Sequence, residues 1–430
     1  MIPYKMKLTE EQEAILRGEK GETLGKVMES LVRYGDLFGA DCMIPVTSAH
    51  NHLVTSFGLK ALGPVYELME KLIAAGALSK QTFSADPRPM DKNVPSSFLQ
   101  DFVFDHFMYT RQEYYEKQLN QLGLMDKDAF TCTCYMKEVG NTPKKGDILS
   151  WSESSAVVYA NSVLGARCNR NSGIIDLMGS VVGFVPRFGL LTDEGRRASW
   201  VVRIETSKKP EAQLLGSAIG MKVMEDVPYI IGLDKWLGDT LTDAACTYLK
   251  DFGAATASNG AVGLYHVENL TPEAKELGRT LIQEGAREYV IDDAELQRIY
   301  DGYPVIWKNP QATPKLCFMG CPHMSLQQLM DWTDKVENGL KAAGNSRVLI
   351  PTVFTAAPAV LKEFEKTPYA PRLKAAGVVT SYICPLMYMN NPLCKKKAVI
   401  TCSNKLRTYT SARYYTEAEI LDIITGKEGK

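Results

Sequence analysis

The sequence predicts an α/β protein whose sheets are mostly parallel and covered by helices. Strand-like apolar segments alternate with amphipathic helical segments, most regularly between residues 316 and 409. Polar loops follow several of these strands, as is common at ligand sites in α/β proteins. The chain has 430 residues and is 45% hydrophobic, which is enough for two to three domains with sizeable cores. We expect a large α/β region at residues 1–310 and a smaller one at residues 311–430.

Charge and composition exclude several classes of function. The 49 basic residues nearly balance the 50 acidic residues, so we expect neither nucleic acid nor an anionic membrane surface as a partner. Apolar runs stay well below the ~18 residues of a membrane span, and the N-terminus lacks an export signal. The ten cysteines are scattered, which is typical of a reducing cytoplasm. Partners should be small molecules or protein.

The first forty residues have a helical pattern that begins after a Thr9 cap and ends near Gly39. A short strand is predicted over residues 41–46. It leads into TSAHNHLVTSFG, where polar side chains including His50 crowd one loop or helix start. Such a loop contacts a ligand, or it is a solvated turn with capping hydroxyls.

An amphipathic helix is predicted over residues 62–77, followed by a strand from Thr82. The strand leads into a proline-stiffened loop that holds Asp86 and Asp91, and these carboxylates either touch a substrate or only solvate the loop. A single long aromatic-rich helix is predicted over residues 101–122.

Residues 131–173 are unusually rich in polar side chains, with cysteines, a Trp-Ser-Glu-Ser-Ser run, arginines, asparagines and glycines. A core-building segment would be dominated by aliphatic residues in a regular period. We therefore expect part of the protein's chemistry in this stretch.

Residues 252–272 show a helix of small residues, then Ser258-Asn259-Gly260, then an apolar strand with His266. Asn259 and Gly260 either allow close approach of the backbone to a ligand or form a tight helix-to-strand turn. His266 reads as an interior, hydrogen-bonded histidine.

The smaller region follows a polar linker at residues 308–315. It is predicted to contain a strand and outlet loop at 316–323, a helix at 325–343, a strand at 346–352 and a helix at 356–364. Two further strand-and-loop segments span residues 378–388 and 397–409.

Three cysteines occupy similar local settings, namely Cys132 in TCTCY, Cys321 in GCPH and Cys384 in ICPL. Three thiolates from three loops would form a tripod that holds an iron–sulfur cluster or a single metal and leaves one position open. The alternative is ordinary buried thiols. Cys134 and Cys317 lie close to candidate ligands and leave the assignment open.

Several blocks together resemble one family, the large catalytic subunit of aconitase X. They are TCTCYMKEVGNTPKKGD, WSESSAVVYANSVLGARCNRNSG, ASNGAVGLYHVENLTPEA, GCPHMSLQQL, and a C-terminal ICP followed by CSNK. The likeness runs in order over nearly the whole chain. It implies aconitase-superfamily α/β/α domains that lack the swivelling domain, and a hydro-lyase that dehydrates a small hydroxy acid.

The resemblance also implies site residues. It places a 4Fe-4S or 2Fe-2S cluster or mononuclear iron on Cys132, Cys321 and Cys384. Leu53, Val54 and Thr55 match a substrate loop, and Lys405 matches a family lysine. This chain departs from the family pattern at four positions, where it has Leu53 for glycine, Asp86 for asparagine, Cys134 for proline and Cys402 for asparagine. Unless it is protonated or paired, an acid at position 86 would repel a phosphate or carboxylate, which indicates a less anionic or an amino-bearing substrate.

The polar stretch then supplies candidate catalytic groups. Arg167 and Arg170, with Lys405, would form an anion clamp for the charge that builds on the substrate carboxylate. Glu153, Ser154 and Ser155 would orient substrate or metal-bound water. The alternatives are a structural ion pair for the arginines and a helix cap for residues 153–155.

The family's proton-abstracting serine comes from a swivelling domain that this chain is not expected to contain, so a small partner subunit is predicted to supply the base. Two other functions stay open. One is a cysteine-nucleophile enzyme that uses Cys132 with His323 as base. The other is a non-catalytic iron–sulfur subunit, with Cys134 or Cys317 as a fourth ligand.

Overall fold

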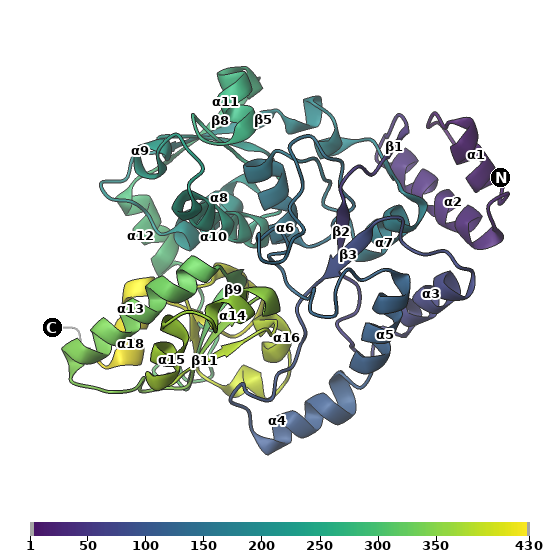
Figure 1. Ribbon diagram of the computed structural model, residues 1–430. Helices are drawn as coiled ribbons and strands as arrows, with labels where there is room; N and C mark the ends of the chain where they lie inside the picture. Colours follow the sequence, from purple (N-terminus) through teal and green to yellow (C-terminus); the bar gives the residue numbers. More distant parts are fainter. Residues whose placement is uncertain (1–3, 428–430) are drawn as a thin grey trace.

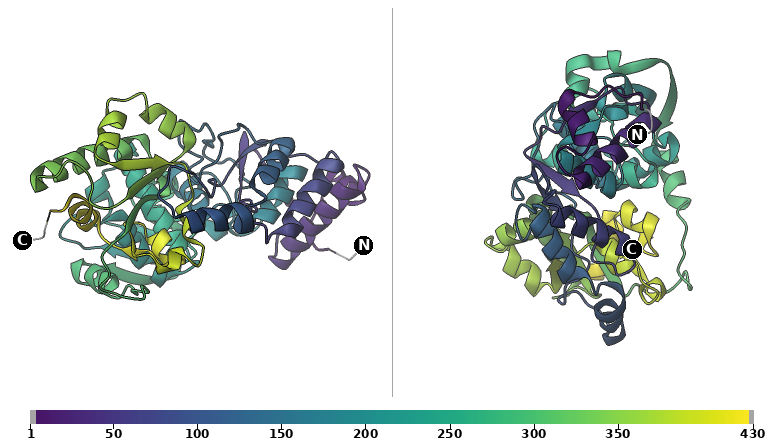
Figure 2. Two further views of the ribbon diagram at one scale, coloured as in Figure 1. Left: turned by 90° about the horizontal axis from the view of Figure 1, so that it is seen from below. Right: turned by 90° about the vertical axis from the view of Figure 1, so that its right-hand side faces the viewer.

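The computed structural model describes residues 4–427, without the side chain of Lys395. The chain forms three lobes, each with its own buried apolar cluster (Figure 1), and residues 131–170 contribute to the second lobe before the chain completes the first. The N-terminal helices and the C-terminal lobe lie at opposite ends of the molecule (Figure 2). Every strand pair is parallel except β1 with β4, among the strands that the structure describes. The predicted α/β class with mostly parallel sheets is confirmed.

The first lobe joins two small sheets to a group of helices. Its first helix is capped as predicted, because the Thr9 hydroxyl and the Gln12 side chain bond each other's backbone N–H groups. The elements of this lobe are α1 (Glu10–Leu16), α2 (Glu22–Leu37), β1 (Met43–Pro45), β2 (His50–Leu53), α3 (Gly63–Ala74), β3 (Thr82–Ala85), α4 (Phe98–Val103), α5 (Gln112–Leu122), α7 (Gly173–Val182) and β4 (Phe184–Pro186).

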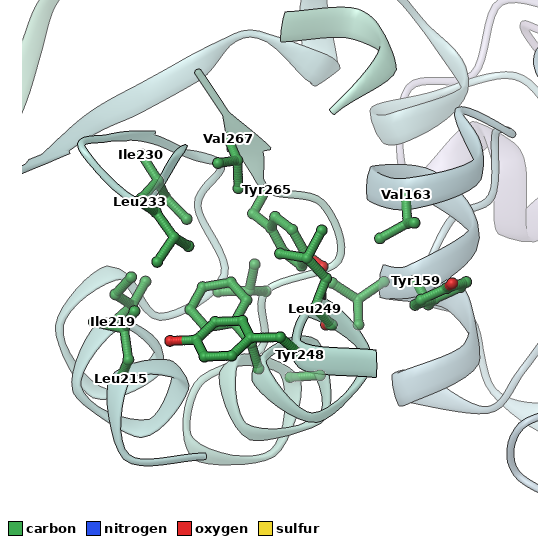
Figure 3. Packing of buried hydrophobic residues seen from close by; sticks show 14 of the residues in the cluster. Tyr159, Val163, Leu215, Ile219, Ile230, Leu233, Tyr248, Leu249, Tyr265 and Val267 are labelled. Carbon is green, nitrogen blue, oxygen red and sulfur yellow. Dashed lines mark hydrogen bonds between the residues drawn. The ribbon is translucent and has the colours of Figure 1, made fainter. Parts of the chain in front are cut away.

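The second lobe has a four-stranded sheet in the order β7-β6-β5-β8. Its elements are α6 (Ser154–Tyr159), β5 (Ala198–Ile204), α8 (Ala212–Val223), β6 (Pro228–Ile231), α9 (Asp234–Leu237), α10 (Asp243–Asn259), β7 (His266–Val267), α11 (Pro272–Leu277), β8 (Ile282–Ile291) and α12 (Asp293–Asp301). Side chains of α6, α8, α10 and the sheet interlock in one core (Figure 3). This core fixes the start of α6, where Glu153 stands.

The third lobe has a five-stranded parallel sheet in the order β11-β10-β9-β12-β13. Its elements are β9 (Leu316–Met324), α13 (Leu326–Ala343), β10 (Thr352–Ala356), α14 (Pro358–Phe364), α15 (Tyr369–Ala375), β11 (Val378–Ser381), α16 (Pro385–Met389), β12 (Val399–Thr401), α17 (Asn404–Tyr409), β13 (Arg413–Tyr414) and α18 (Glu417–Thr425). The sheet begins at Leu316, close to the division expected at residue 311, which stays a prediction.

Three predicted elements differ in the structure. The polar segment HNHL forms strand β2 instead of a loop, because Thr82 and Ser84 on β3 satisfy its two imidazoles across the pair. The predicted helix 101–122 is broken into α4, a π-helical turn at Phe104–Met108, and α5. The predicted strand 346–352 begins only at Thr352, and β9 continues through its predicted outlet loop.

No helix among residues 4–427 combines the length and the apolar character needed to cross a bilayer.

Candidate active site

A buried ion pair joins the second and third lobes. The Lys405 ammonium, on α17, donates to Glu153 Oε1 and to Ser155 Oγ at 3.4 Å. The other carboxylate oxygen of Glu153 accepts the Ser155 hydroxyl and the Ala156 N–H, both at 2.6 Å, and so caps α6. Glu153 is therefore both the helix cap and a member of the lysine site, so the two predicted roles coexist.

Burial opposes the charge on each partner of this pair. Burial raises the pKa of Glu153, but the Lys405 ammonium and the hydrogen bonds from Ser155 and Ala156 together lower it below its usual value. Burial lowers the pKa of Lys405, but Glu153, Cys321 and Cys132 together raise it. Both groups are held ionised in a region that is almost closed to solvent.

The three predicted metal ligands come from three separate segments that meet near Lys405. Cys132 follows Phe130 and Thr131, Cys321 lies within β9, and Cys384 begins α16. Burial raises the pKa of each thiol, to about 11 for Cys321, and the Lys405 charge opposes that rise at all three. Cys321 also lies within charge range of both Cys132 and Cys384.

The chemistry of these thiols fits a soft metal centre. Thiolates are the ligands preferred by iron–sulfur clusters, and a buried ammonium favours the thiolate form. Among residues 4–427, no three Cys, His, Asp or Glu side chains yet stand at ligating distances from one point. Ligation would require the three sulfur atoms to move closer together.

Cys134 and Cys317 are each buried in the core of a lobe. Cys134 is fully buried in the second lobe's core, beside His52. Cys317 is fully buried between strands of the third lobe, and burial alone raises the pKa of its thiol. The closed four-thiolate site therefore gains no support from this arrangement.

The imidazole of His323 does not act on Cys132. Nδ1 lies 3.0 Å from the Thr131 hydroxyl and Nε2 lies 3.0 Å from the Ile383 carbonyl oxygen, so both ring nitrogens are occupied. Only the backbone N–H of His323 reaches Cys132 Sγ, at 3.4 Å. Burial lowers the pKa of His323 to about 4, and the arrangement lacks the thiol–imidazole contact of a cysteine nucleophile.

A second buried pair, His52 with Asp86, lies at the ends of β2 and β3. His52 Nε2 and Asp86 Oδ1 are 3.5 Å apart, and neither atom has a hydrogen-bond partner among the described residues. Burial raises the pKa of Asp86, which the nearby Glu153 charge reinforces and His52 opposes. Asp86 was predicted, but His52 was missed. Its only signal was the period-two spacing with His50.

The predicted substrate loop is only partly available to a ligand. Leu53 is fully buried in the first lobe's core. His50 stands at the opposite end of β2 and bonds Thr82 instead of the site. Val54 and Thr55 follow the strand, where the Val54 N–H donates to Ser152 and the Thr55 hydroxyl donates to Tyr115. The roles of Leu53 and His50 in substrate binding stay predictions.

The two predicted clamp arginines separate. Arg167 pairs with Asp193 at 2.5 Å and lies 3.9 Å from Glu273, which is the structural ion pair given above as the alternative. Arg170 donates to the Ala261 carbonyl and makes no ion pair among the described residues. It is exposed yet close enough to Glu153 to feel its charge. Only Arg170 is placed to meet an anion at the site.

The remaining predicted residues have structural contacts. Asp91 accepts hydrogen bonds from Asn93 N and from the Ser381 hydroxyl at 2.8 Å. Asn259 accepts from Arg407 and from the Ser217 hydroxyl, and thereby joins α8, α10 and α17. A Cβ at Gly260 would lie 2.3 Å from the Gly220 carbonyl oxygen, so this glycine permits close helix packing. Ser154 is half-buried at the first position of α6.

A polar cavity of about 350 Å³ lies between the second and third lobes. It is bordered by Glu211, Gln213, Asp251, Cys321, Ser403 and Glu417. Cys321 is its only lining residue from the predicted site, so this cavity lies beside the cysteine and lysine cluster.

Comparison with known proteins agrees with this architecture. Family models described as "Aconitase X first domain" and "Aconitase X second domain" match residues 5–194 and 198–301. The phosphomevalonate dehydratase large subunit of Thermococcus kodakarensis is 34% identical over 83% of this chain and 82% of its own length. That of Methanocaldococcus jannaschii is 31% identical over 77% and 79%.

Two further comparisons extend the match. The cis-3-hydroxy-L-proline dehydratase of Hypocrea jecorina is 27% identical over 76% of this chain, which spans 53% of that longer protein. The crystal structure of Thermococcus kodakaraensis aconitase X, in its holo form, superposes with a TM-score of 0.79 at 28% identity. That alignment covers 97% of this chain and all of the crystallised one. The chain therefore belongs to the aconitase X family and is a dehydratase of that family.

Proposed function

We propose that this chain is the large subunit of a dehydratase that removes water from a small hydroxy acid at an iron or iron–sulfur centre. Cys132, Cys321 and Cys384 would hold the centre. The observation that carries the proposal is the convergence of these three thiols, of which Cys321 and Cys384 are buried and Cys132 is half-buried, on the Lys405–Glu153 pair. When bound, such a centre supplies a Lewis acid for the departing hydroxyl group.

The chain's own residues would bind and polarise the substrate. Removing a proton beside a carboxylate builds negative charge on that carboxylate. Lys405 would stabilise this charge, because its ammonium is fixed and shielded from water. Ser155, within 3.4 Å of the ammonium, would orient the substrate beside it.

The charges around the site favour a substrate that carries both signs. Arg170 makes no ion pair among the described residues and would accept a carboxylate at the rim. Asp86 Oδ1 lies 3.5 Å from His52 Nε2, has no hydrogen-bond partner among residues 4–427, and would accept an ammonium group. A phosphate would meet the Asp86 and Glu153 carboxylates instead. We therefore propose an amino-bearing hydroxy acid, in line with the cis-3-hydroxy-L-proline dehydratase relatives.

A small partner subunit would complete the site with the base. Relatives are named large subunits, and the hydroxyproline dehydratases are longer than this chain's match to them. A cytoplasmic location is proposed from the ten cysteines, all of which are free thiols.

Metal content and spectra test the centre. Cys132→Ala, Cys321→Ala and Cys384→Ala should each lose iron after anaerobic reconstitution, as measured by iron analysis, visible absorption and EPR. Cys317→Ala, which alters a fully buried cysteine in the third lobe's core, is the control and should keep its iron. Retention of iron by all three ligand variants would overturn the proposed centre.

Activity then separates the competing functions. The reconstituted chain with its small subunit should dehydrate a hydroxy acid, and the chain alone should not do so at full rate. A non-catalytic iron–sulfur subunit would bind the centre but turn over no substrate with the partner present. A cysteine nucleophile would lose activity on alkylation while its iron stayed bound.

A further inference from the structure

His323 contacts all three cysteine-bearing segments at once. Its ring lies 3.0 Å from the Thr131 hydroxyl, next to Cys132, and 3.0 Å from the Ile383 carbonyl, next to Cys384. His323 itself lies two residues after Cys321 on β9. Its side chain is fully buried, so each of these hydrogen bonds is closed to water.

The directions of the hydrogen bonds fix the ring. A carbonyl oxygen can only accept, so Nε2 carries the proton that is donated to Ile383. Nδ1 is then an acceptor, and the Thr131 hydroxyl donates to it. Thr131 Oγ also accepts the Thr133 N–H at 3.0 Å, which orients the hydroxyl. The network is complete, with one donor for each acceptor.

The backbone of His323 is anchored as well. Its N–H reaches Cys132 Sγ at 3.4 Å, and its carbonyl oxygen accepts from the fully buried Lys250 ammonium at 3.2 Å. Lys250 belongs to α10, so the second lobe holds the strand that carries the ring. The ring therefore has a fixed position from which to hold the two loops.

We propose that His323 is a positioning residue that holds the Cys132, Cys321 and Cys384 segments together around the proposed metal centre. The proposal rests on the proposed function for its purpose, but the positioning itself is a property of the metal-free chain. A metal site needs its ligands held by neighbouring groups, and the hydrogen bonds to the Thr131 hydroxyl and the Ile383 carbonyl do this here.

The test compares two buried histidines. His323→Leu removes both ring hydrogen bonds. His266→Leu is the matched control, because His266 is equally buried and bonds a carbonyl oxygen, that of Arg196, away from the cysteines. In metal-free protein, alkylation of Cys132, Cys321 and Cys384 is followed by mass spectrometry. We expect His323→Leu to raise the alkylation rates of these three cysteines by about tenfold, because the segments open locally. The alkylation rate of Cys317 should not change. His266→Leu should leave all four rates unchanged.

A conservative variant separates the loss of one hydrogen bond from a general loss of the fold. Thr131→Val removes one hydroxyl at the same volume, and should speed alkylation of Cys132 while leaving Cys384 unchanged. Unchanged alkylation rates in His323→Leu would overturn the proposal, and so would an equal rise in the rate of Cys317. Equal rises in the alkylation rates of Cys132 and Cys384 in Thr131→Val would also overturn it. Chelator-driven iron loss should also be about tenfold faster in His323→Leu. If the unaltered chain bound no iron, the proposed function would fail, and the alkylation rates would still decide the role of His323.

Discussion

At the scale of single residues, the Lys405–Glu153 pair is a buried ion pair whose two charges both lose hydration free energy by leaving water. Both side chains are almost fully buried, and each is charged only because the other is present. Removing one partner leaves an unpaired buried charge, whereas removing both does not.

Lys405→Met should therefore lower the free energy of unfolding by about 3–5 kcal/mol. The double variant with Glu153→Gln should recover a good part of that loss. Lys335→Met breaks an exposed pair with Glu417 and should lose less than about 1 kcal/mol. Urea unfolding measures all three, and a Lys405→Met loss as small as that of Lys335→Met would contradict the prediction.

Asp86 belongs to the same scale, because one carboxylate decides which charge the site accepts. Asp86→Asn keeps the shape and removes the charge. We expect kcat/KM for an amino-bearing hydroxy acid to fall by about 10–100-fold, and kcat/KM for phosphomevalonate not to fall. Steady-state kinetics of the reconstituted pair measure both. Equal losses on the two substrates would argue against a charge-selective role.

At the scale of elements, the start of α7 is packed against the segment that follows β2. A Cβ on Gly173 would lie 1.5 Å from the Val54 carbonyl oxygen, which is far closer than any real contact. The glycine is thus required by this approach, and it sets the path of residues Val54 and Thr55 near the site.

Gly173→Ala should displace that segment and destabilise the protein by about 1–3 kcal/mol, the usual result of overpacking. Gly63→Ala is the control, since a Cβ there has no atom within 4 Å, and it should change stability by less than about 0.5 kcal/mol. Thermal or urea unfolding distinguishes them. Equal stabilities for both variants would show that the contact relaxes freely.

Elements with a clear local signal were predictable. The capped α1, the amphipathic α3 and the strand–helix alternation of the third lobe follow from spacing and capping residues alone. Strand β2 was not predictable from local sequence, because its histidine side chains have hydrogen-bond partners only on the neighbouring strand β3. The ion pair of Arg167 was given only as one of two alternatives, since Asp193 and Glu273 are distant in sequence.

At the scale of the whole molecule, the candidate site exists only because three lobes meet. The first lobe brings Asp86, the second brings Glu153, and the third brings Lys405 and two cysteines. Long-range placement of this kind has no local sequence signal. The family resemblance supplied what spacing could not, including the choice of the three cysteines.

The junction between the second and third lobes is sensitive to pH through Glu211, which precedes α8. Its carboxylate accepts from the Tyr414 hydroxyl and the Glu417 N–H, both at 3.1 Å, in the third lobe. Burial, together with the Glu417 charge, raises the pKa of Glu211 from 4.5 to about 7. Below pH 4.5 the group is protonated in both the folded and unfolded states. As pH rises towards 7, the unfolded state releases the proton first, so the free energy of unfolding falls by roughly 3 kcal/mol in all.

Glu211→Gln should remove this fall, because glutamine has the shape of the protonated acid and can still accept from the Glu417 N–H. Near pH 4.5 the variant and the unaltered chain should have equal free energies of unfolding. At pH 8 the free energy of unfolding of the variant should be higher by roughly 3 kcal/mol. Urea unfolding at the two pH values measures the difference, and parallel pH profiles would contradict it. Since Gln213, two residues on, bonds Asn404 beside Lys405, a junction weakened above pH 7 also loosens the support of the lysine.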